Sequence, residues 1–327
     1  MNHTIKRKYV LFGIGMLVLL SCFTTTFQAE ETTINIICTN SALADFTSNL
    51  LTENVTIDYI MPAGACPAQY DTTPSDVNKI ISTDILISFG LPKMEGWLGG
   101  LLNHNPDCSI IECSYMGEWN VPSNAKKYVE KLRNELSLLL PAYNDTIQTN
   151  AQAYVAQIDE TAEKIQEMIV NNGSLDKKVI CMEWQKEFIE WLGLNVTYSY
   201  GSENLLSVQD KLKVSDAASV GDIYAIIDNL QSGTEFGAQI ASETGASHLI
   251  FTNFPEAVPG ADTYLEMITY NTNQLIDGIA TYEYKQGDIA ELENKLSVVE
   301  LERNASIAVA VICVILAGVF AVLYKRK

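Results

Sequence analysis

Histidine is scarce in this chain, which has three histidines among 327 residues. His3 lies at the N-terminal end, so only His104 and His248 are available to a folded domain. A zinc site built from three histidines is therefore excluded. His248 lies in an apolar stretch and is expected to be packed, whereas His104 lies in a polar stretch and is expected at the surface.

The motifs of several enzyme classes are also absent. The sequence contains no phosphate-binding loop, no G-x-G-x-x-G, no H-E-x-x-H and no G-x-S-x-G. A thiol nucleophile at Cys181 would require one of the two remaining histidines as its base. We therefore expect a binding protein and not an enzyme.

Basic residues are few, with 21 Lys and Arg against 40 Asp and Glu. Six of the basic residues lie at positions 6–8 and 325–327, where there are no acids. The remainder of the chain is strongly acidic. Such a surface disfavours binding to nucleic acid and to anionic lipid, and attracts cations.

The N-terminus has the pattern of an export signal over residues 1–29. Three basic residues at positions 6–8 precede an apolar run from Tyr9 to Leu20. Two processing routes remain open. Leu19-Leu20-Ser21-Cys22 resembles a lipobox that would place a lipid on Cys22, and the alternative is ordinary cleavage near Gln28-Ala29.

The C-terminus predicts a membrane anchor. Residues 307–324 carry no charge, and 18 helical residues cover about 27 Å of hydrocarbon. Lys325-Arg326-Lys327 predicts a cytoplasmic tail. Residues 286–306 are charged and predict a helical stalk. We expect a single-pass protein of the cell membrane with its large domain outside.

Asparagine and cysteine patterns fit an external domain. Sequons at five positions make it a candidate glycoprotein: Asn54, Asn144, Asn172, Asn195 and Asn304. Five cysteines lie between the two ends, an odd number that leaves at least one without a partner inside the chain: Cys38, Cys66, Cys108, Cys113 and Cys181. Cys108 and Cys113 are close enough in sequence to pair, if their geometry allows it.

Strand and helix patterns alternate, which indicates an α/β fold with mostly parallel sheets. Strands are expected at 34–38, 55–60, 84–89, 178–182, 195–200 and 248–252. Helices are expected at 42–51, 74–81, 123–140, 141–171, 184–192, 219–231, 234–244 and 263–284. The helix that begins at Pro141 is too long for one small layer. It predicts a connection over 141–172 between two lobes, at 30–140 and 173–285.

Several stretches, in order, resemble the cluster A-I receptors of ABC transporters, the zinc/manganese-binding family. The most specific is MPAGACPAQYDTTPSD, residues 61–76, which resembles that family's Pro-x-Gly-x-x-Pro-His-x-Tyr-Glu-x-Thr-Pro-Ser-Asp. Weaker matches lie at 84–97, 143–165, 188–194, 243–246 and 264–271. Together they cover about residues 34–284.

The resemblance implies a two-lobed receptor that binds its ligand between the lobes and has no catalytic activity. It implies a permease and a cytoplasmic ATPase as partners, and a metal ion, metal complex or other small molecule as cargo. A transition-metal ion is one such cargo. The alternative is a surface interaction or adhesion protein that kept the fold and lost metal transport.

The metal ligands of that family do not carry over. The resemblance places its three histidines at Ala68, at Gly117 or the nearby Met116, and at Met182. It places its aspartate at Thr252 or Asn253.

Two replacement sites remain open, beside a non-metal ligand or a lost site. Sulfur atoms suit a soft metal such as Cu(I), and the tentative set is Cys66, Met116, Cys181 and Met182. Oxygen ligands for a harder metal would come from Gln69, Tyr70, Asp71, Glu118 and Glu183. Four tryptophans are candidates to line the cleft, Trp97, Trp119, Trp184 and Trp191, and Trp119 alone lies on a motif that carries a ligand.

Overall fold

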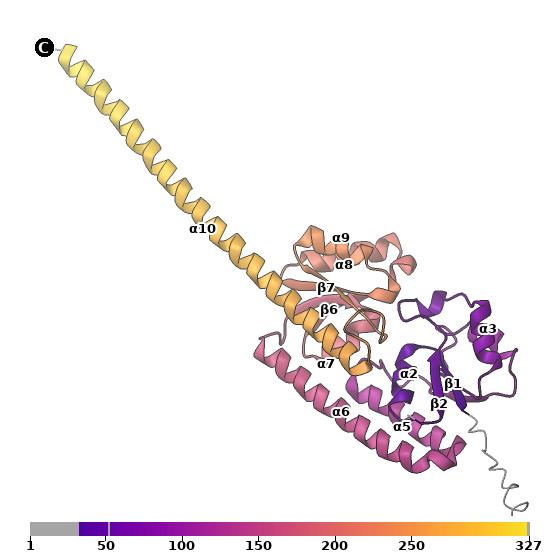
Figure 1. Cartoon of the computed structure of the whole chain (residues 1–327). Helices are drawn as coiled ribbons and strands as arrows, with labels where there is room; N and C mark the ends of the chain where they lie inside the picture. The colour runs from indigo at the N-terminus through magenta and orange to yellow at the C-terminus, as the bar shows by residue number, and fades with distance from the viewer. Residues whose placement is uncertain (1–32, 52, 326–327) are drawn as a thin grey trace, which may run out of the picture.

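The computed structural model describes residues 33–51 and 53–325. The predicted export signal, including Cys22, and the last two residues lie outside the described part. Two lobes rest on a pair of helices, and one long helix projects away from them (Figure 1).

The first lobe contains a sheet of four parallel strands in the order β2-β1-β3-β4. Its strands are β1 (Ile34–Cys38), β2 (Val55–Tyr59), β3 (Ile85–Ser88) and β4 (Ser109–Glu112). Its helices are α2 (Ser41–Ser48), α3 (Pro74–Ile81) and α4 (Leu98–Leu102). The predicted start of α3 is confirmed: Thr73 caps the helix, and Asp76 completes a capping box behind Pro74. Strand β4 was not among the expected elements.

Two helices, α5 (Pro122–Leu139) and α6 (Asn144–Asn171), pack against each other beneath the lobes (Figure 1). Helix α5 begins at Pro122 and not at the expected cap Ser123, because proline is well suited to a first helical position. At 28 residues, α6 is about 42 Å long. Near its start Asn150 donates to Leu50 of the first lobe, and near its end Gln166 donates to Trp191 of the second. The long helix therefore contacts both lobes, as predicted.

The second lobe repeats the arrangement with parallel strands in the order β6-β5-β7-β8. Its strands are β5 (Lys178–Met182), β6 (Asn195–Tyr200), β7 (Ile223–Asn229) and β8 (Ser247–Phe251). Its helices are α7 (Lys186–Trp191), α8 (Val208–Ser219) and α9 (Glu235–Thr244).

The helix expected at 219–231 is wrong. Helix α8 ends at Ser219, and residues 223–229 form the central strand β7. Six of the seven β7 residues are buried, because strands β5 and β8 flank it and helices cover the sheet. A strand buried on both faces lacks the alternation that distinguishes strands from helices in a sequence.

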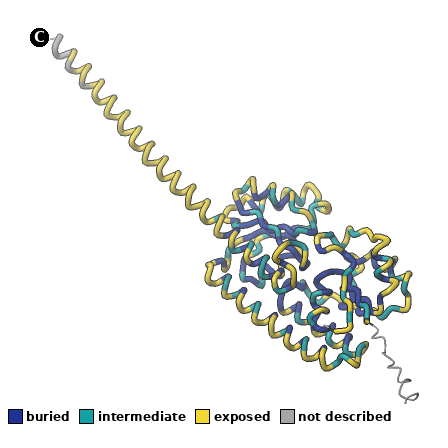
Figure 2. The backbone as a smooth tube through the Cα atoms, in the orientation of Figure 1, coloured by how far each residue is buried: buried dark blue, intermediate teal, exposed yellow. Residues whose placement is uncertain are grey.

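The last helix, α10 (Tyr264–Lys325), is 62 residues long and continuous. Its first part packs against β7, β8 and α6, with Tyr264, Met267 and Leu275 buried. The part beyond residue 284 is exposed and leaves the lobes (Figure 2). It joins the predicted stalk and the predicted membrane segment in one helix. In the described part of the chain, this is the one helix long and apolar enough to cross a membrane.

Candidate functional site

A cavity of about 100 Å³ lies between the two lobes. The first lobe contributes Met94 and the turn that contains Cys66 and Ala68, and Phe254 follows β8 on the opposite side. Trp119 comes from the segment that connects β4 to α5. Asn229 ends β7, so part of the wall is the carboxyl end of a parallel sheet. Such ends are the usual ligand sites of α/β folds.

A network of uncharged amides forms the base of this cavity. The Asn253 Oδ1 atom accepts hydrogen bonds from Asn120 Nδ2 at 2.6 Å and from Gln185 Nε2 at 2.7 Å. Gln231 Nε2 donates to the Ala63 backbone oxygen in the first lobe and to Thr252 Oγ1 in the second, both at 2.9 Å. The network therefore links the lobes through neutral groups, and Thr252 belongs to it without lining the cavity.

Trp119 fills the centre of the interface and is 6% exposed. Its ring stacks on Phe89 with 4.4 Å between centroids and on Phe254 with 5.5 Å. Its Nε1 atom donates to the backbone oxygen of Asn253 at 2.6 Å. This side chain thus packs against both lobes.

Asn229 leaves one buried group without a partner. Its Oδ1 atom accepts from the Gln231 backbone N–H at 3.1 Å, which fixes the orientation of the amide. Its Nδ2 atom is buried and has no acceptor within the protein. Buried donors are rarely left unsatisfied, so this amide nitrogen is available to a bound acceptor.

Of the four sulfur residues in the predicted soft-metal set, Cys66 alone lines the cavity. Met182 is fully buried, and its Sδ atom accepts from the Asn229 N–H at 3.4 Å. Cys181 precedes it on β5 and packs in the opposite core, where burial raises the thiol pKa. Met116 is half-buried and donates its N–H to the Tyr128 hydroxyl. The soft-metal set stays a prediction.

The oxygen residues are dispersed. Gln69, Asp71 and Glu183 are exposed, and the Tyr70 hydroxyl donates to Asp76 at 2.7 Å within the first lobe. In the described part of the chain, no three His, Cys, Asp or Glu side chains are placed to hold a metal ion. The six described cysteines are free, so Cys108 and Cys113 are not paired with each other.

Glu118 faces Glu187 of α7 where the two lobes meet. The Glu118 N–H donates to Glu187 Oε2 at 3.1 Å, and Asn124 Nδ2 donates to the same oxygen at 3.2 Å. The pKa of Glu118 is raised to about 8, first by burial and then by repulsion from Glu187. Its Oε2 atom is buried without a partner. A carboxyl with this pKa is largely protonated at neutral pH, which disfavours it as a metal ligand there.

His248 lies outside the cavity, on β8. Its Nε2 atom is 2.7 Å from the fully buried Asp228 Oδ2, and Tyr200 donates to the other oxygen of that carboxylate. This is the packed role expected for His248.

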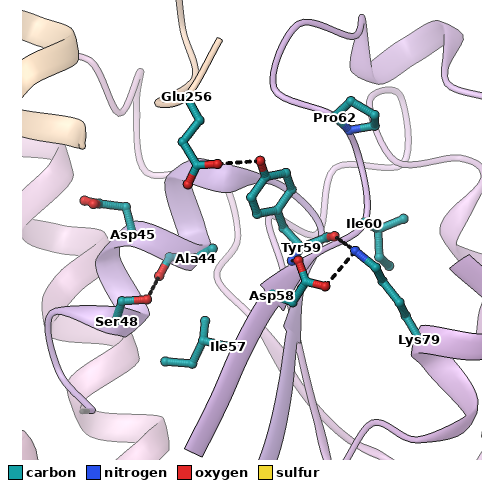
Figure 3. A pocket seen from close by; sticks show the side chains of 10 residues that line it. All are labelled: Ala44, Asp45, Ser48, Ile57, Asp58, Tyr59, Ile60, Pro62, Lys79 and Glu256. Carbon is teal, nitrogen blue, oxygen red and sulfur yellow. Dashed lines mark hydrogen bonds and ion pairs between the residues drawn. The ribbon is translucent and has the colours of Figure 1, made fainter. Parts of the chain in front are cut away.

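A larger depression of about 540 Å³ lies beside the edge strand β2 (Figure 3). Its charged groups already have partners: Lys79 pairs with Asp58, and Tyr59 donates to Glu256, both at 2.7 Å. Asp45 accepts from the Tyr154 hydroxyl at 2.8 Å. We therefore place the candidate site in the cavity between the lobes, where a polar atom remains unpaired.

Sequence reasoning identified Cys66, Ala68, Trp119, Trp184 and Asn253, which all line this cavity. It missed further lining residues: Met94, Ser202, Leu205, Asn229 and Gln231. The last two were assigned to a helix over 219–231. A polar Asp-Asn pair directly after the apolar run Ile223–Ile227 was the available signal for the end of a buried strand.

Two parallel α/β lobes, a long helix that contacts both and a cavity between them define a two-lobed solute-binding protein. Residues 36–278 match the family described as zinc-uptake complex component A, periplasmic (ZnuA). The chain belongs to this family. It is therefore a substrate-binding component of an ABC transporter and is not itself an enzyme.

Individual relatives agree with this assignment. The chain is 23% identical over 273 residues to the manganese-binding lipoprotein MntA of Halalkalibacterium halodurans, which covers 76% of this chain and 89% of the relative. It is 22% identical over 315 residues to the iron ABC transporter substrate-binding lipoprotein MtsA of Streptococcus pyogenes serotype M1, covering 84% and 99%.

Solved structures share the fold. A crystal structure of ZnuA superimposes with a TM-score of 0.64 at 17% identity, covering 74% of this chain and 98% of that one. The Mn-bound periplasmic metal-binding protein of Candidatus Liberibacter asiaticus gives 0.65 at 19% identity, covering 75% and 99%.

Proposed function

We propose that this protein is a membrane-anchored receptor of an ABC importer that binds a metal ion or a metal complex between its lobes and passes it to a permease. The observation that carries the proposal is the cavity at the carboxyl end of β7, lined from both lobes in a member of this family. Cys66, Ala68, Trp119 and Asn253 are the predicted residues proposed to contact the cargo.

A metal as the transported element is supported by the relatives, whose names specify manganese and iron. The acidic surface, with 40 Asp and Glu against 21 Lys and Arg, also favours the approach of cations. The permease and its ATPase are proposed as partners on the same family grounds.

Anchoring through α10 is the second part of the proposal. Its outer residues are exposed and apolar from Ile307 onward, and basic residues follow at 325–327. That arrangement favours lobes outside the membrane and a cytoplasmic tail. Residues 285–306 span about 33 Å as a helix. A stalk of this length keeps the receptor at a high effective concentration near a permease in the same membrane.

Uptake by intact cells tests the function. Cells lacking this gene and grown under metal limitation are compared with cells complemented by the full chain. We expect the content of one transition metal, measured by elemental mass spectrometry, to fall in the deletion strain and to recover on complementation. A chain ending at residue 290 is the control for anchoring and should restore uptake poorly. Unchanged metal contents in all strains would contradict the proposal.

A further inference from the structure

The cavity between the lobes carries no charge. Among the described residues that line it, none is Asp, Glu, Lys, Arg or His. A bare divalent cation prefers anionic or imidazole ligands, and its transfer into a site without them is strongly unfavourable. In this conformation the cavity therefore offers no compensation for an isolated metal ion.

The carboxylates adjacent to the lining residues are already satisfied. Glu95 follows Met94 and is buried, but it accepts from Thr39 Oγ1 at 2.5 Å and from two backbone N–H groups. Glu203 follows Ser202 and pairs with Lys211 at 2.9 Å. Neither carboxylate needs a cation from the cavity to complete its contacts.

What the cavity does offer is a hydrogen-bond donor. Asn229 is 2% exposed, lines the cavity and holds an Nδ2 group that has no acceptor. Its amide orientation is set by Gln231, so the donor cannot exchange places with Oδ1. A site built around an unpaired buried donor selects ligands that supply an acceptor atom and rejects those that do not.

The mouth of the cavity is apolar. Leu205 is 82% exposed and Trp184 is 44% exposed, and the exposed Ala68 lies on the opposite lobe. Trp119 lies deeper, between Phe89 and Phe254. Exposed apolar side chains around a pocket with a few polar groups are typical of sites for organic ligands. About 100 Å³ accommodates only the polar end of such a molecule.

We infer that the cargo is an uncharged organic molecule, either free or wrapped around a metal ion as a neutral complex. An acceptor atom of its polar end lies on Asn229 Nδ2, and its apolar body lies against Trp184 and Leu205. The inference rests on the proposed import function and specifies the chemical class of its cargo. The metal in this account brings its ligands with it, because the cavity lacks them.

The test is native mass spectrometry of the full-length protein in detergent, with tryptophan fluorescence as a second readout. One probe is ZnCl₂ or MnCl₂ alone, and the other is the small-molecule fraction of a deproteinised cell extract. We expect an adduct from the extract whose mass exceeds that of a metal ion, and no stoichiometric adduct from either salt. Elemental analysis of the adduct then separates a metal complex from a metal-free molecule.

Variants assign the contacts. Asn229→Asp keeps an oxygen for the Gln231 N–H and removes the free donor, so we expect unchanged thermal unfolding and at least tenfold weaker binding. Leu205→Ala should weaken binding, whereas Leu212→Ala, which removes another exposed leucine from outside the cavity, should not.

Three outcomes overturn the inference: a bare ion bound stoichiometrically, no adduct from the extract, or equal or tighter binding by Asn229→Asp. A bare-ion adduct together with protein-dependent metal uptake would leave the proposed import function standing. Loss of that uptake dependence would instead remove the import function itself.

Discussion

The indole nitrogen of Trp119 donates a hydrogen bond to the backbone oxygen of Asn253 at 2.6 Å and so joins the segment after β4 to the loop after β8. The same ring stacks on Phe89 and Phe254. Packing and hydrogen bonding between the two lobes therefore meet in one side chain, directly beside the candidate site.

The two contributions of Trp119 can be separated by substitution. Trp119→Phe keeps an aromatic ring and loses the hydrogen bond, so we expect a loss of about 1 kcal/mol in the free energy of unfolding. Trp119→Ala also removes the buried ring, and we expect a loss of about 3–5 kcal/mol. Denaturant unfolding followed by circular dichroism measures both. Equal losses in the two variants would show that the ring stacking contributes little.

Glu118 predicts a dependence of stability on pH. Its folded pKa is raised to about 8 from an ordinary value of 4.5, by burial first and by Glu187 second. Between these values the folded protein holds a proton that the unfolded chain releases, so stability falls as pH rises and levels off above about pH 8. Thermal unfolding from pH 4 to pH 9 should show a shallower decline for Glu118→Gln. Parallel profiles for the two proteins would contradict this assignment.

Gly117 occupies a position that the family resemblance assigns to histidine. Its φ is +97°, and a Cβ atom there would lie 2.3 Å from Asn124 Nδ2. We expect Gly117→Ala to cost about 1–2 kcal/mol from backbone strain alone, and more from this overlap. Gly245→Ala is the control, because it also has positive φ but no atom within 4 Å. An equal loss of unfolding free energy in both variants would show that Asn124 moves aside.

Truncation tests the independence of the lobes from the anchor. Beyond Glu283, which pairs with Lys177 at 2.5 Å, the described residues of α10 are exposed. A chain ending at residue 290 should therefore leave the membrane fraction and keep the unfolding temperature of the full chain. Fractionation and circular dichroism measure the two properties. A large fall in unfolding temperature would mean that the outer helix supports the lobes.

Cysteine reactivity tests the placement of the sulfur atoms. Cys66 is half-buried in the cavity wall, whereas Cys38 and Cys181 are fully buried. Iodoacetamide should label Cys66 in the folded protein and the other two only after unfolding. Bound cargo should protect Cys66, and Cys66→Ser controls for its signal in peptide mass spectrometry. Labelling of Cys181 in the folded protein would contradict its burial.

Local chemistry explains how much of the fold was predictable. The Thr73-Pro74 helix start and the long α6 follow from capping and helical length, and the structure contains both. Strand β7 was missed because its burial on both faces removes the alternation that marks a strand. That error also hid Asn229 and Gln231, whose role depends on their place at the end of that strand.

The candidate site was predictable only where a motif marked it. Cys66 and Trp119 lie on segments that resemble family motifs, and both line the cavity. Cys181 and Met182 were grouped because they are neighbours in sequence, but adjacent residues of a strand point to opposite faces. The unpaired Asn229 amide could not be predicted, because it depends on which acceptors the folded chain brings near it.

The most direct measurement of the central claim is an experimental structure of the full-length protein purified with its cargo. The account predicts ligand density between Trp119 and Trp184, with an acceptor atom within hydrogen-bonding distance of Asn229 Nδ2. An isolated metal ion coordinated by protein side chains, or density outside the cavity between the lobes, would contradict it.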